Sequence, residues 1–457
     1  MVRRLGGIEQ YFYQRSSLNL HSCFSVGVEL NSLPNRSDLI CALRRVVNLH
    51  FQLYCNAYKS NNEVVVNPIG EPIKFDDVVD YMDWDTYGEE EINSVFRKYN
   101  FEYGVDKPLW KVIVVPKANK MIFATDHLFF DGIATVLFWT ELLKSLEELK
   151  QDNDLDVDEI IYRPGGSTDS IDQCHPYEKL PIPFSWKVKR PIVKALFTIA
   201  PGAVVSQDAG IIQFDEYKIP EDYLKKNSND DGCYQIKNTN RQISLKMSSN
   251  KLKVIMKDCK QHHVSFTAYL TAVLYLALGK IPKEKYSGST IKYEVPMNTR
   301  NRISNSGEYS NSYGTFVAGG EFIETLDFER DEWELAQSIH QKIVEKSTTG
   351  VMDAINEARL LELVDAKKFM KMKFETTTGP SSTFEVTNLG FQNFSQNEHS
   401  KYTVTDAFFN EPQLFTNLIT YSVISTPSGG LNCSMAYPEK LDSILCNSVE
   451  FLKNKFN

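Results

Sequence analysis

A histidine and an aspartate four residues apart, followed directly by a glycine, form the pattern in this chain that could do chemistry: His127, Asp131 and Gly132. Histidine is the side chain whose ordinary pKa lies closest to neutral pH, so it can take a proton from a substrate and return it. The three residues between the two polar ones are all apolar. The spacing therefore predicts a general base that is presented next to a buried segment.

The segments on either side of this motif indicate where it lies. Residues 120–125 are an apolar run that predicts a buried strand, and residues 133–150 place their apolar side chains at helical spacing. The motif then occupies a strand-to-helix connection, where a rigid interior element delivers side chains to a site. A packed histidine without chemistry is the alternative that the pattern leaves open.

Other chemistries find less support in the sequence. Two metal ligands at the spacing of His127 and Asp131 need a third and a fourth, and no nearby cluster supplies them, so we expect no metal. No serine stands in a G-x-S-x-G pattern, so a hydrolase nucleophile has no anchor. The eight cysteines are scattered without a C-x-x-C pair, which favours reduced thiols in a reducing compartment.

Bulk properties bound the class of protein. A chain of 457 residues exceeds what one core usually covers, so two domains are expected. A net charge of −9 argues against a nucleic-acid partner. The N-terminal residues lack the apolar run of a secretory signal, and no stretch is long and apolar enough to span a bilayer. We expect an intracellular monomer, either cytoplasmic or attached peripherally to the endoplasmic reticulum or lipid droplets.

The chain divides into three parts. Residues 1–150 alternate predicted helices and strands, residues 151–240 are rich in Pro, Gly, Asp and Asn and read as a crossover with loops, and residues 241–457 restart the alternation. Predicted helices are 38–54, 251–260, 265–278, 333–346 and 441–455. Further predicted strands are 64–66, 110–115, 242–245, 291–295, 316–322, 383–386 and 418–425.

The motif around His127 also resembles the active-site motif of a known enzyme family. H-x-x-x-D-G on a strand-to-helix connection resembles the active-site motif of CoA-dependent acyltransferases with the chloramphenicol-acetyltransferase-like fold. Further segments resemble that fold in the same order over nearly the whole chain: 38–50, 107–112, 296–300, 311–316 and 380–390. Segments 12–16, 18–24 and 379–391 resemble the fungal alcohol acetyltransferase family more narrowly. The D-F-G-W-G motif of the plant branch is absent, so no motif locates the CoA contacts.

The resemblance implies an α/β fold of two chloramphenicol-acetyltransferase-like sandwich domains, packed as a pseudo-dimer with the active site in a tunnel between them. It implies acetyl-CoA as co-substrate, His127 as general base and a structural pair between Asp131 and Arg300. Gly132 would allow a close approach of backbone and substrate. Thr387 and Asn388 match the position of the family's oxyanion donor.

The sequence says least about the acceptor, the molecule that would receive the acetyl group. The closest resemblance within the family is to acetylation of the amine of a sphingoid-base-like amino alcohol, so we expect a small amphipathic acceptor. O-acetylation of an alcohol, and a non-catalytic lipid-binding relative, remain alternatives. Residues 183–197 mix apolar and aromatic residues with four cations, which suits either contact with a lipid surface or a packed crossover helix.

Overall fold

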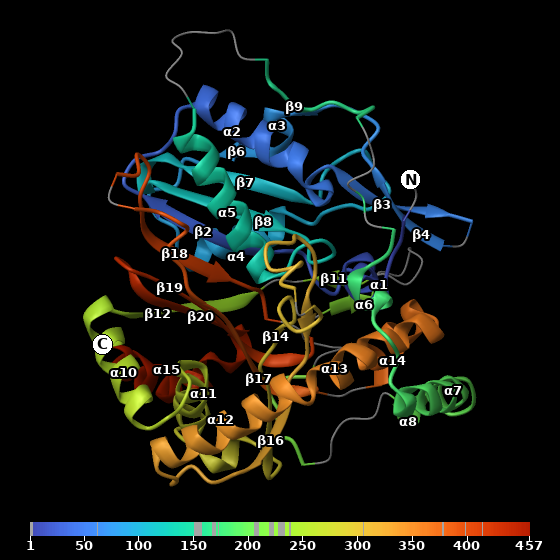
Figure 1. Ribbon diagram of the computed structural model, residues 1–457. Helices are drawn as coiled ribbons and strands as arrows, with labels where there is room; N and C mark the ends of the chain where they lie inside the picture. Colours follow the sequence, from blue (N-terminus) through green and yellow to red (C-terminus); the bar gives the residue numbers. More distant parts are fainter. Residues whose placement is uncertain are drawn as a thin grey trace.

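The structure is a computed structural model that describes residues 3–61, 63–149, 158–166, 171, 173–204, 210–218, 224–226, 234–236, 239–304, 306–376, 379–397, 399–413 and 415–457. It is a mixed α/β protein in which two sheets lie one above the other, each covered by helices on its outer side (Figure 1). Parts of the predicted crossover, among them 151–157 and 227–233, lie outside the described residues.

The upper sheet in Figure 1 has five strands in the order β18-β2-β8-β7-β6. Its strands are β2 Phe24–Leu30, β6 Val79–Tyr81, β7 Trp110–Val115, β8 Lys120–Thr125 and β18 Val404–Asn410. Helices α2 Arg36–Leu49 and α5 Gly132–Glu147 contact each other and pack their apolar side chains into the same core as this sheet. The central strand β8 has five of its six residues buried, so its carboxyl end delivers side chains to the interior.

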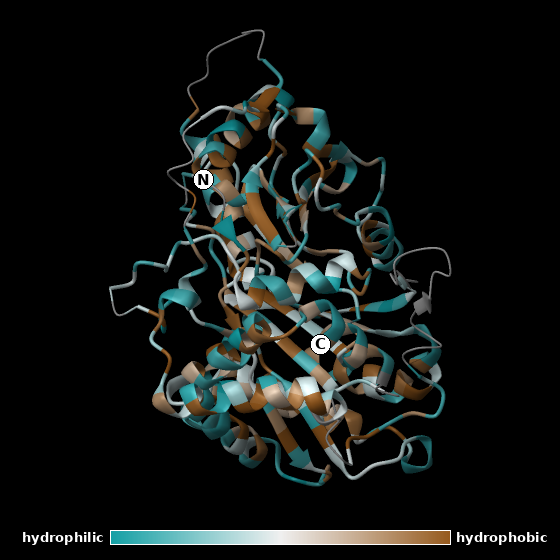
Figure 2. Ribbon diagram, turned by 90° about the vertical axis from the view of Figure 1, so that its right-hand side faces the viewer, coloured by the Kyte–Doolittle hydropathy of each residue, from teal (hydrophilic) through white to brown (hydrophobic). Residues whose placement is uncertain are grey.

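The lower sheet has six strands in the order β12-β20-β19-β17-β13-β16. Its strands are β12 Asn240–Met247, β13 Thr290–Glu294, β16 Glu321–Thr325, β17 Ser382–Phe391, β19 Asn417–Thr426 and β20 Gly430–Pro438. Helices α10 Ser249–Gln261, α11 Phe266–Leu278, α12 Glu332–Thr348 and α15 Asp442–Phe456 cover its outer side. In Figure 2 the inner strands are coloured mostly brown, because most of their residues are hydrophobic. Along the outer helices, hydrophobic and hydrophilic residues alternate.

The remaining elements are shorter or lie at the edge of the two sheets. The helices are α1 Gly7–Ser17, α3 Phe75–Val78, α4 Glu89–Lys98, α6 Pro176–Lys179, α7 Phe184–Ile199, α8 Pro201–Val204, α13 Val351–Ala358 and α14 Ala366–Thr376. The strands are β1 Arg3–Arg4, β3 Cys55–Ser60, β4 Glu63–Pro68, β5 Ile73–Lys74, β9 Ile160–Tyr162, β10 Leu224–Lys226, β11 Tyr234–Ile236, β14 Met297–Asn298 and β15 Val317–Ala318. Short 3-10 helices are Phe51–Leu53, Pro116–Ala118, Lys283–Lys285, Arg359–Leu363 and Glu439–Leu441.

The two halves of the chain are joined at several points. Strand β18 from the C-terminal half pairs with β2 in the upper sheet. Phe130 forms a parallel bridge with Gly314, and the Thr315 hydroxyl donates to the carbonyls of His127 and Leu128 at 3.1 and 3.0 Å. The C-terminal part therefore supports the connection that carries the motif, while the division at about residues 150 and 240 stays a prediction.

Two predicted elements differ from the structure. The helix predicted over 38–54 ends at Leu49, because His50 takes an extended conformation and the chain turns through a 3-10 helix into β3. The strand predicted over 316–322 is split into β15 and β16, with Gly319 and Gly320 between them. Glycine lacks a side chain to pack and often marks such a break in a strand.

Candidate active site

His127 lies two residues beyond the end of β8, on the loop that leads into α5. The start of this loop is held by the buried carboxylate of Asp126, which accepts hydrogen bonds from Ser16 Oγ at 2.6 Å and the Tyr103 hydroxyl at 2.7 Å. Asp126 also accepts the backbone N–H of Leu128 at 2.8 Å. The loop is thus fixed before and after the histidine, which restricts where its ring can lie.

The ring of His127 is packed between aromatic side chains. It stacks on Phe12 with ring centroids 3.9 Å apart and planes 2° from parallel, and Phe24 lies 4.9 Å away. Burial and, to a smaller extent, the charge of Arg15 together lower its pKa to about 3, against weaker opposing effects of its own backbone and of Asp131. The ring is therefore neutral at physiological pH, the form that can accept a proton. Among the described residues, no group hydrogen-bonds to its buried Nδ1.

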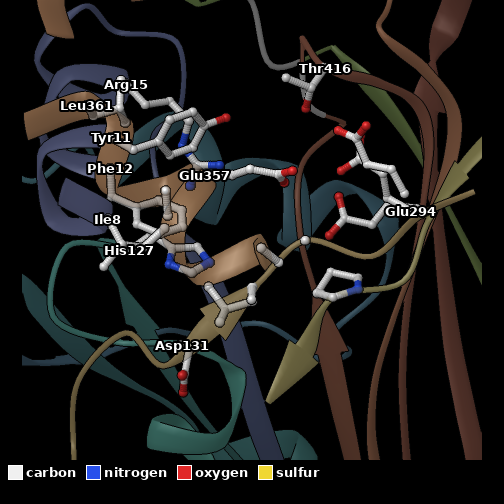
Figure 3. A pocket seen from close by; sticks show the side chains of 18 of the residues that line it. Ile8, Tyr11, Phe12, Arg15, His127, Asp131, Glu294, Glu357, Leu361 and Thr416 are labelled. Carbon is white, nitrogen blue, oxygen red and sulfur yellow. The ribbon is translucent and has the colours of Figure 1, made fainter. Parts of the chain in front are cut away.

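Asp131 is locked by a bidentate pair with Arg300. Arg300 Nη1 donates to Oδ2 at 2.8 Å and Nη2 donates to Oδ1 at 2.9 Å, with side-chain exposures of 1% for Arg300 and 8% for Asp131. The same carboxylate caps α5 by accepting from Ala134 N and also accepts from Phe316 N, both at 2.8 Å. Figure 3 shows the carboxylate pointing away from the His127 ring. Asp131 therefore fixes the loop and does not face the ring of the histidine.

Gly132 begins α5 and approaches another element closely. A Cβ at this position would collide with the Leu389 side chain of β17. Its backbone conformation does not need glycine, so the requirement is for space between α5 and β17. The close neighbour that the structure records is thus a leucine of the other half of the chain, although Gly132 also lines the cavity described below.

The two predicted oxyanion donors are placed differently. Both lie within β17 rather than at a strand end. Thr387 lines the same cavity as His127, but its hydroxyl donates to Glu385 Oε1 at 2.9 Å. The Asn388 amide donates to Thr267 Oγ1 at 3.1 Å and its oxygen accepts from Gly390 N at 2.8 Å. The structure brings Thr387 to the site and leaves Asn388 outside the cavity lining.

A cavity of about 560 Å³ lies in front of His127. It is bordered by residues of α1, of the motif loop, of β17 and of the helices α7, α13 and α14, so both halves of the chain contribute. One region of its wall is apolar and is formed by Val193, Phe197, Leu360, Leu361, Val364 and Phe369. This lining suits the hydrocarbon part of an amphipathic ligand.

Another region of the wall carries carboxyl groups. Glu385 and Glu411 are buried and Glu294 is partly buried, and Figure 3 shows Glu294 across the cavity from His127. Burial raises the pKa of Glu411 to about 7. It raises that of Glu385 well above its usual range, with the neighbouring Glu411 adding to the effect. A cationic ligand would stabilise the ionised forms of these groups.

Arg15 is the buried cation of the same cavity, with 4% of its surface exposed. Its guanidinium lies 4.8 Å from the centre of the Phe12 ring. Within the described part of the chain, no acceptor pairs with its Nε or Nη2. A buried donor without an acceptor is costly, which points to a group that a ligand or a reaction supplies.

Sequence reasoning missed several of these residues. Ile8, Tyr11, Phe12 and Arg15 line the cavity from one face of α1, at the i, i+3, i+4, i+7 spacing of a helix. That spacing was visible in the sequence, but nothing local showed that this face meets the His127 loop. The glutamates Glu294 and Glu385 in strands, and Glu411 directly after β18, carried no signal, because isolated acidic residues give no indication of what they face.

No described helix combines the length and apolar character that a membrane span needs. In the described ranges, no three His, Cys, Asp or Glu side chains gather where a metal ion could be held.

The fold is shared with solved structures, one of which is an acetyltransferase. The trichothecene 15-O-acetyltransferase of Fusarium sporotrichioides superposes with a TM-score of 0.68 at 12% identity, over 99% of this chain and 94% of that one. An epimerization domain of tyrocidine synthetase superposes with a TM-score of 0.66 at 14% identity, over 99% and 96%. At such identities the likeness concerns the fold, and it confirms the predicted fold class.

Sequence comparison then gives the family. The family model described as alcohol acetyltransferase matches residues 4–456, so the chain belongs to the alcohol acetyltransferase family. The N-acetyltransferase SLI1 of Saccharomyces cerevisiae is 38% identical over 469 aligned positions, covering all of both chains. Alcohol O-acetyltransferase 2 of the same yeast is 20% identical over 95% of this chain and 91% of that one. The protein is an acetyltransferase, as the sequence motif predicted.

Proposed function

We propose that the protein transfers the acetyl group of acetyl-CoA to the amine of an amphipathic amino alcohol of the sphingoid-base type, with His127 as general base. The observation that carries the proposal is the composition of one cavity. It places the neutral histidine beside buried carboxyl groups and an apolar wall. The carboxyl groups suit an ammonium head and the apolar wall suits a tail. The high identity to an N-acetyltransferase favours the amine over the hydroxyl.

The chemistry needs no protein nucleophile. The neutral amine attacks the thioester carbonyl, the C–N bond forms, and the C–S bond then breaks to release CoA as a thiol. The amine becomes strongly acidic once it is bonded to the carbonyl carbon, so a weak base such as His127 is sufficient to remove its proton. Because Nδ1 is buried, we assign proton transfer to Nε2. The proton that His127 accepts can then pass to the departing thiolate.

The tetrahedral intermediate needs a donor for its oxyanion. The Thr387 hydroxyl is committed to Glu385, whereas Nε and Nη2 of Arg15 have no acceptor among the described residues. Arg15 lines the same cavity and acts electrostatically on His127. We therefore assign oxyanion stabilisation to Arg15, and Thr387 contributes where its hydroxyl turns from Glu385 towards the substrate.

The test is acetyl transfer by the purified protein with a long-chain amino alcohol and, separately, isoamyl alcohol, with products identified by mass spectrometry. We expect the amide to form at the higher kcat/KM, because each tail methylene buried in an apolar wall contributes about 0.8 kcal/mol before ordering costs. His127→Ala should lose about a hundredfold or more with both acceptors while staying folded. His399→Ala, in an exposed loop, is the matched control.

The pH dependence separates the two acceptors. The pKa of His127 is lowered to about 3, so its ring is neutral throughout the range from pH 6 to 8 and its ionisation should not limit the rate there. Amide formation should still rise about tenfold per pH unit below the pKa of the amine, because only the neutral amine attacks. Ester formation should be nearly flat. Ester from isoamyl alcohol with no amide from the amino alcohol would instead assign alcohol O-acetylation. If no CoA is released with either acceptor, the result would favour a non-catalytic lipid-binding relative.

A further inference from the structure

Helix α7, Phe184–Ile199, carries a row of exposed apolar side chains on the outside of the molecule. Phe184 and Ile199 are each 82% exposed, and Val188, Ile192 and Leu196 are 49%, 54% and 44% exposed. These five belong to a set of twelve large hydrophobic side chains that are exposed over the described ranges. So large a share on a single helix indicates a contact surface rather than scattered surface residues.

The spacing of these residues places them on one face. Their separations of four, four, four and three residues keep them within about a third of the helix circumference. We call these five residues the α7 stripe. A single apolar face of this length is the pattern of a helix that lies on an interface with its axis parallel to the surface.

Cations border the α7 stripe. Lys187, Lys189 and Lys194 are exposed, and the helix contains no acidic residue. Lys189 Nζ lies 4.7 Å from the centre of the Trp186 ring, while Arg190 pairs with Glu362 at 3.0 Å. Exposed lysines beside an apolar face complement a surface that is both apolar and anionic, as anionic lipid provides.

The opposite side of α7 is fixed to the body of the protein beside the candidate active site. Trp186 is buried and its indole N–H donates to Asp353 at 2.5 Å. Val193 and Phe197 line the cavity that contains His127. One helix thus contributes to the apolar wall of the cavity on one side and presents the α7 stripe on the other. Figure 1 shows α7 at the edge of the molecule.

We propose that α7 docks the protein on a bilayer that contains anionic lipid, so that a membrane-dissolved acceptor reaches the cavity along this helix. The purpose of the docking rests on the proposed function, whereas the docking itself does not. The 16 residues of α7 carry four cations, so the helix would lie in the headgroup region rather than cross the bilayer.

Vesicle flotation tests the docking directly. Wild-type protein should float with phosphatidylcholine vesicles that contain about 30% phosphatidylserine, and bind vesicles of phosphatidylcholine alone more weakly. Phe184→Ser combined with Ile192→Ser should lower the partition coefficient about tenfold or more. The control is Val254→Ser combined with Met256→Ser on α10, which removes two exposed apolar side chains from another helix and should float like wild type.

A charge variant keeps the test independent of helix stability. Lys187→Gln combined with Lys194→Gln leaves the α7 stripe intact and should abolish the preference for anionic vesicles. Kinetics link docking to the site: the Phe184 and Ile192 variant should lose kcat/KM for a vesicle-borne acceptor and keep it for isoamyl alcohol or another water-soluble acceptor. Neither substituted residue lines the cavity.

Two results would overturn the proposal. One is flotation of the Phe184 and Ile192 variant at the wild-type level. The other is a wild-type dimer in sedimentation that this variant converts to monomer without any vesicle binding, which would make the α7 stripe an interface between two copies of the chain. Docking does not require catalysis, so the inactive His127→Ala protein should still float with the vesicles. Its flotation distinguishes a failure of docking from a failure of the proposed function.

Discussion

Removal of the Asp131 carboxylate would leave the Arg300 guanidinium buried without its counter-charge. Breaking a buried ion pair from one side costs about 3–5 kcal/mol, because the remaining charge is still excluded from water. Asp131 also caps α5, and loss of such a cap costs about 1 kcal/mol. Asp131→Ala should therefore lower the free energy of unfolding by about 4–6 kcal/mol. That is a large part of the stability of an ordinary protein.

The pairing itself is tested by a double-mutant cycle. Arg300→Ala alone should cost about 3–5 kcal/mol, since Asp131 then lies buried opposite a gap. The double variant removes both charges, so its loss should fall short of the sum of the two single losses by about 2 kcal/mol or more. Asp131→Asn should be milder than Asp131→Ala, because asparagine still caps α5 and still accepts one hydrogen bond from the guanidinium.

Urea unfolding followed by tryptophan fluorescence and by circular dichroism measures these losses, and acetyl transfer measures their effect on the His127 loop. The control pair is Asp158 and Arg163, an exposed bridge of 2.5 Å whose removal should change stability by less than about 1 kcal/mol. Losses at Asp131 and Arg300 that add to within about 0.5 kcal/mol, or a harmless Arg300→Ala, would refute the reasoning.

Three further predictions concern the cavity. Arg15→Gln should lower kcat about a hundredfold to a thousandfold without lowering the melting temperature, and should move the acid limb of the pH–rate profile upwards because Arg15 helps to depress the pKa of His127. Gly132→Ala should cost about 1–3 kcal/mol in denaturant unfolding, since the new methyl group displaces the Leu389 side chain, and Gly132→Ala with Leu389→Ala should recover part of that loss. Glu411 has a pKa raised from 4.5 to about 7, so the folded state holds its proton more tightly than the unfolded chain; the resulting stability is fully present below pH 4.5 and is lost as pH rises through about 7. Glu411→Gln should therefore be stabilising relative to wild type at pH 8 and close to neutral at pH 4, and thermal unfolding at both values checks this.

The sequence alone predicted the connection that carries the chemistry. The apolar run before His127 and the helical spacing after it are local signals, and they locate β8 and α5 to within a few residues. The order of further segments along the chain was sufficient for the fold class and the family. The strand and the helix depend on which residues are buried and at what period, which a single sequence records directly. The fold class and the family came from the resemblance of the motifs to a known family.

The tertiary structure decided what surrounds the histidine. Phe12 and Arg15 reach it from α1, more than a hundred positions away in the sequence, and Glu385 of β17 and Glu411, directly after β18, come from the opposite half of the chain. Thr387 has its hydroxyl turned to Glu385, a detail of side-chain hydrogen bonding that spacing does not encode. A periodic pattern reports that a side chain is buried but not what it is buried against, because the partner is set by the packing of elements distant in the chain. For the same reason, the sequence of α7 indicated an amphipathic segment, and only the folded chain placed one side of it on the cavity and the other in solvent.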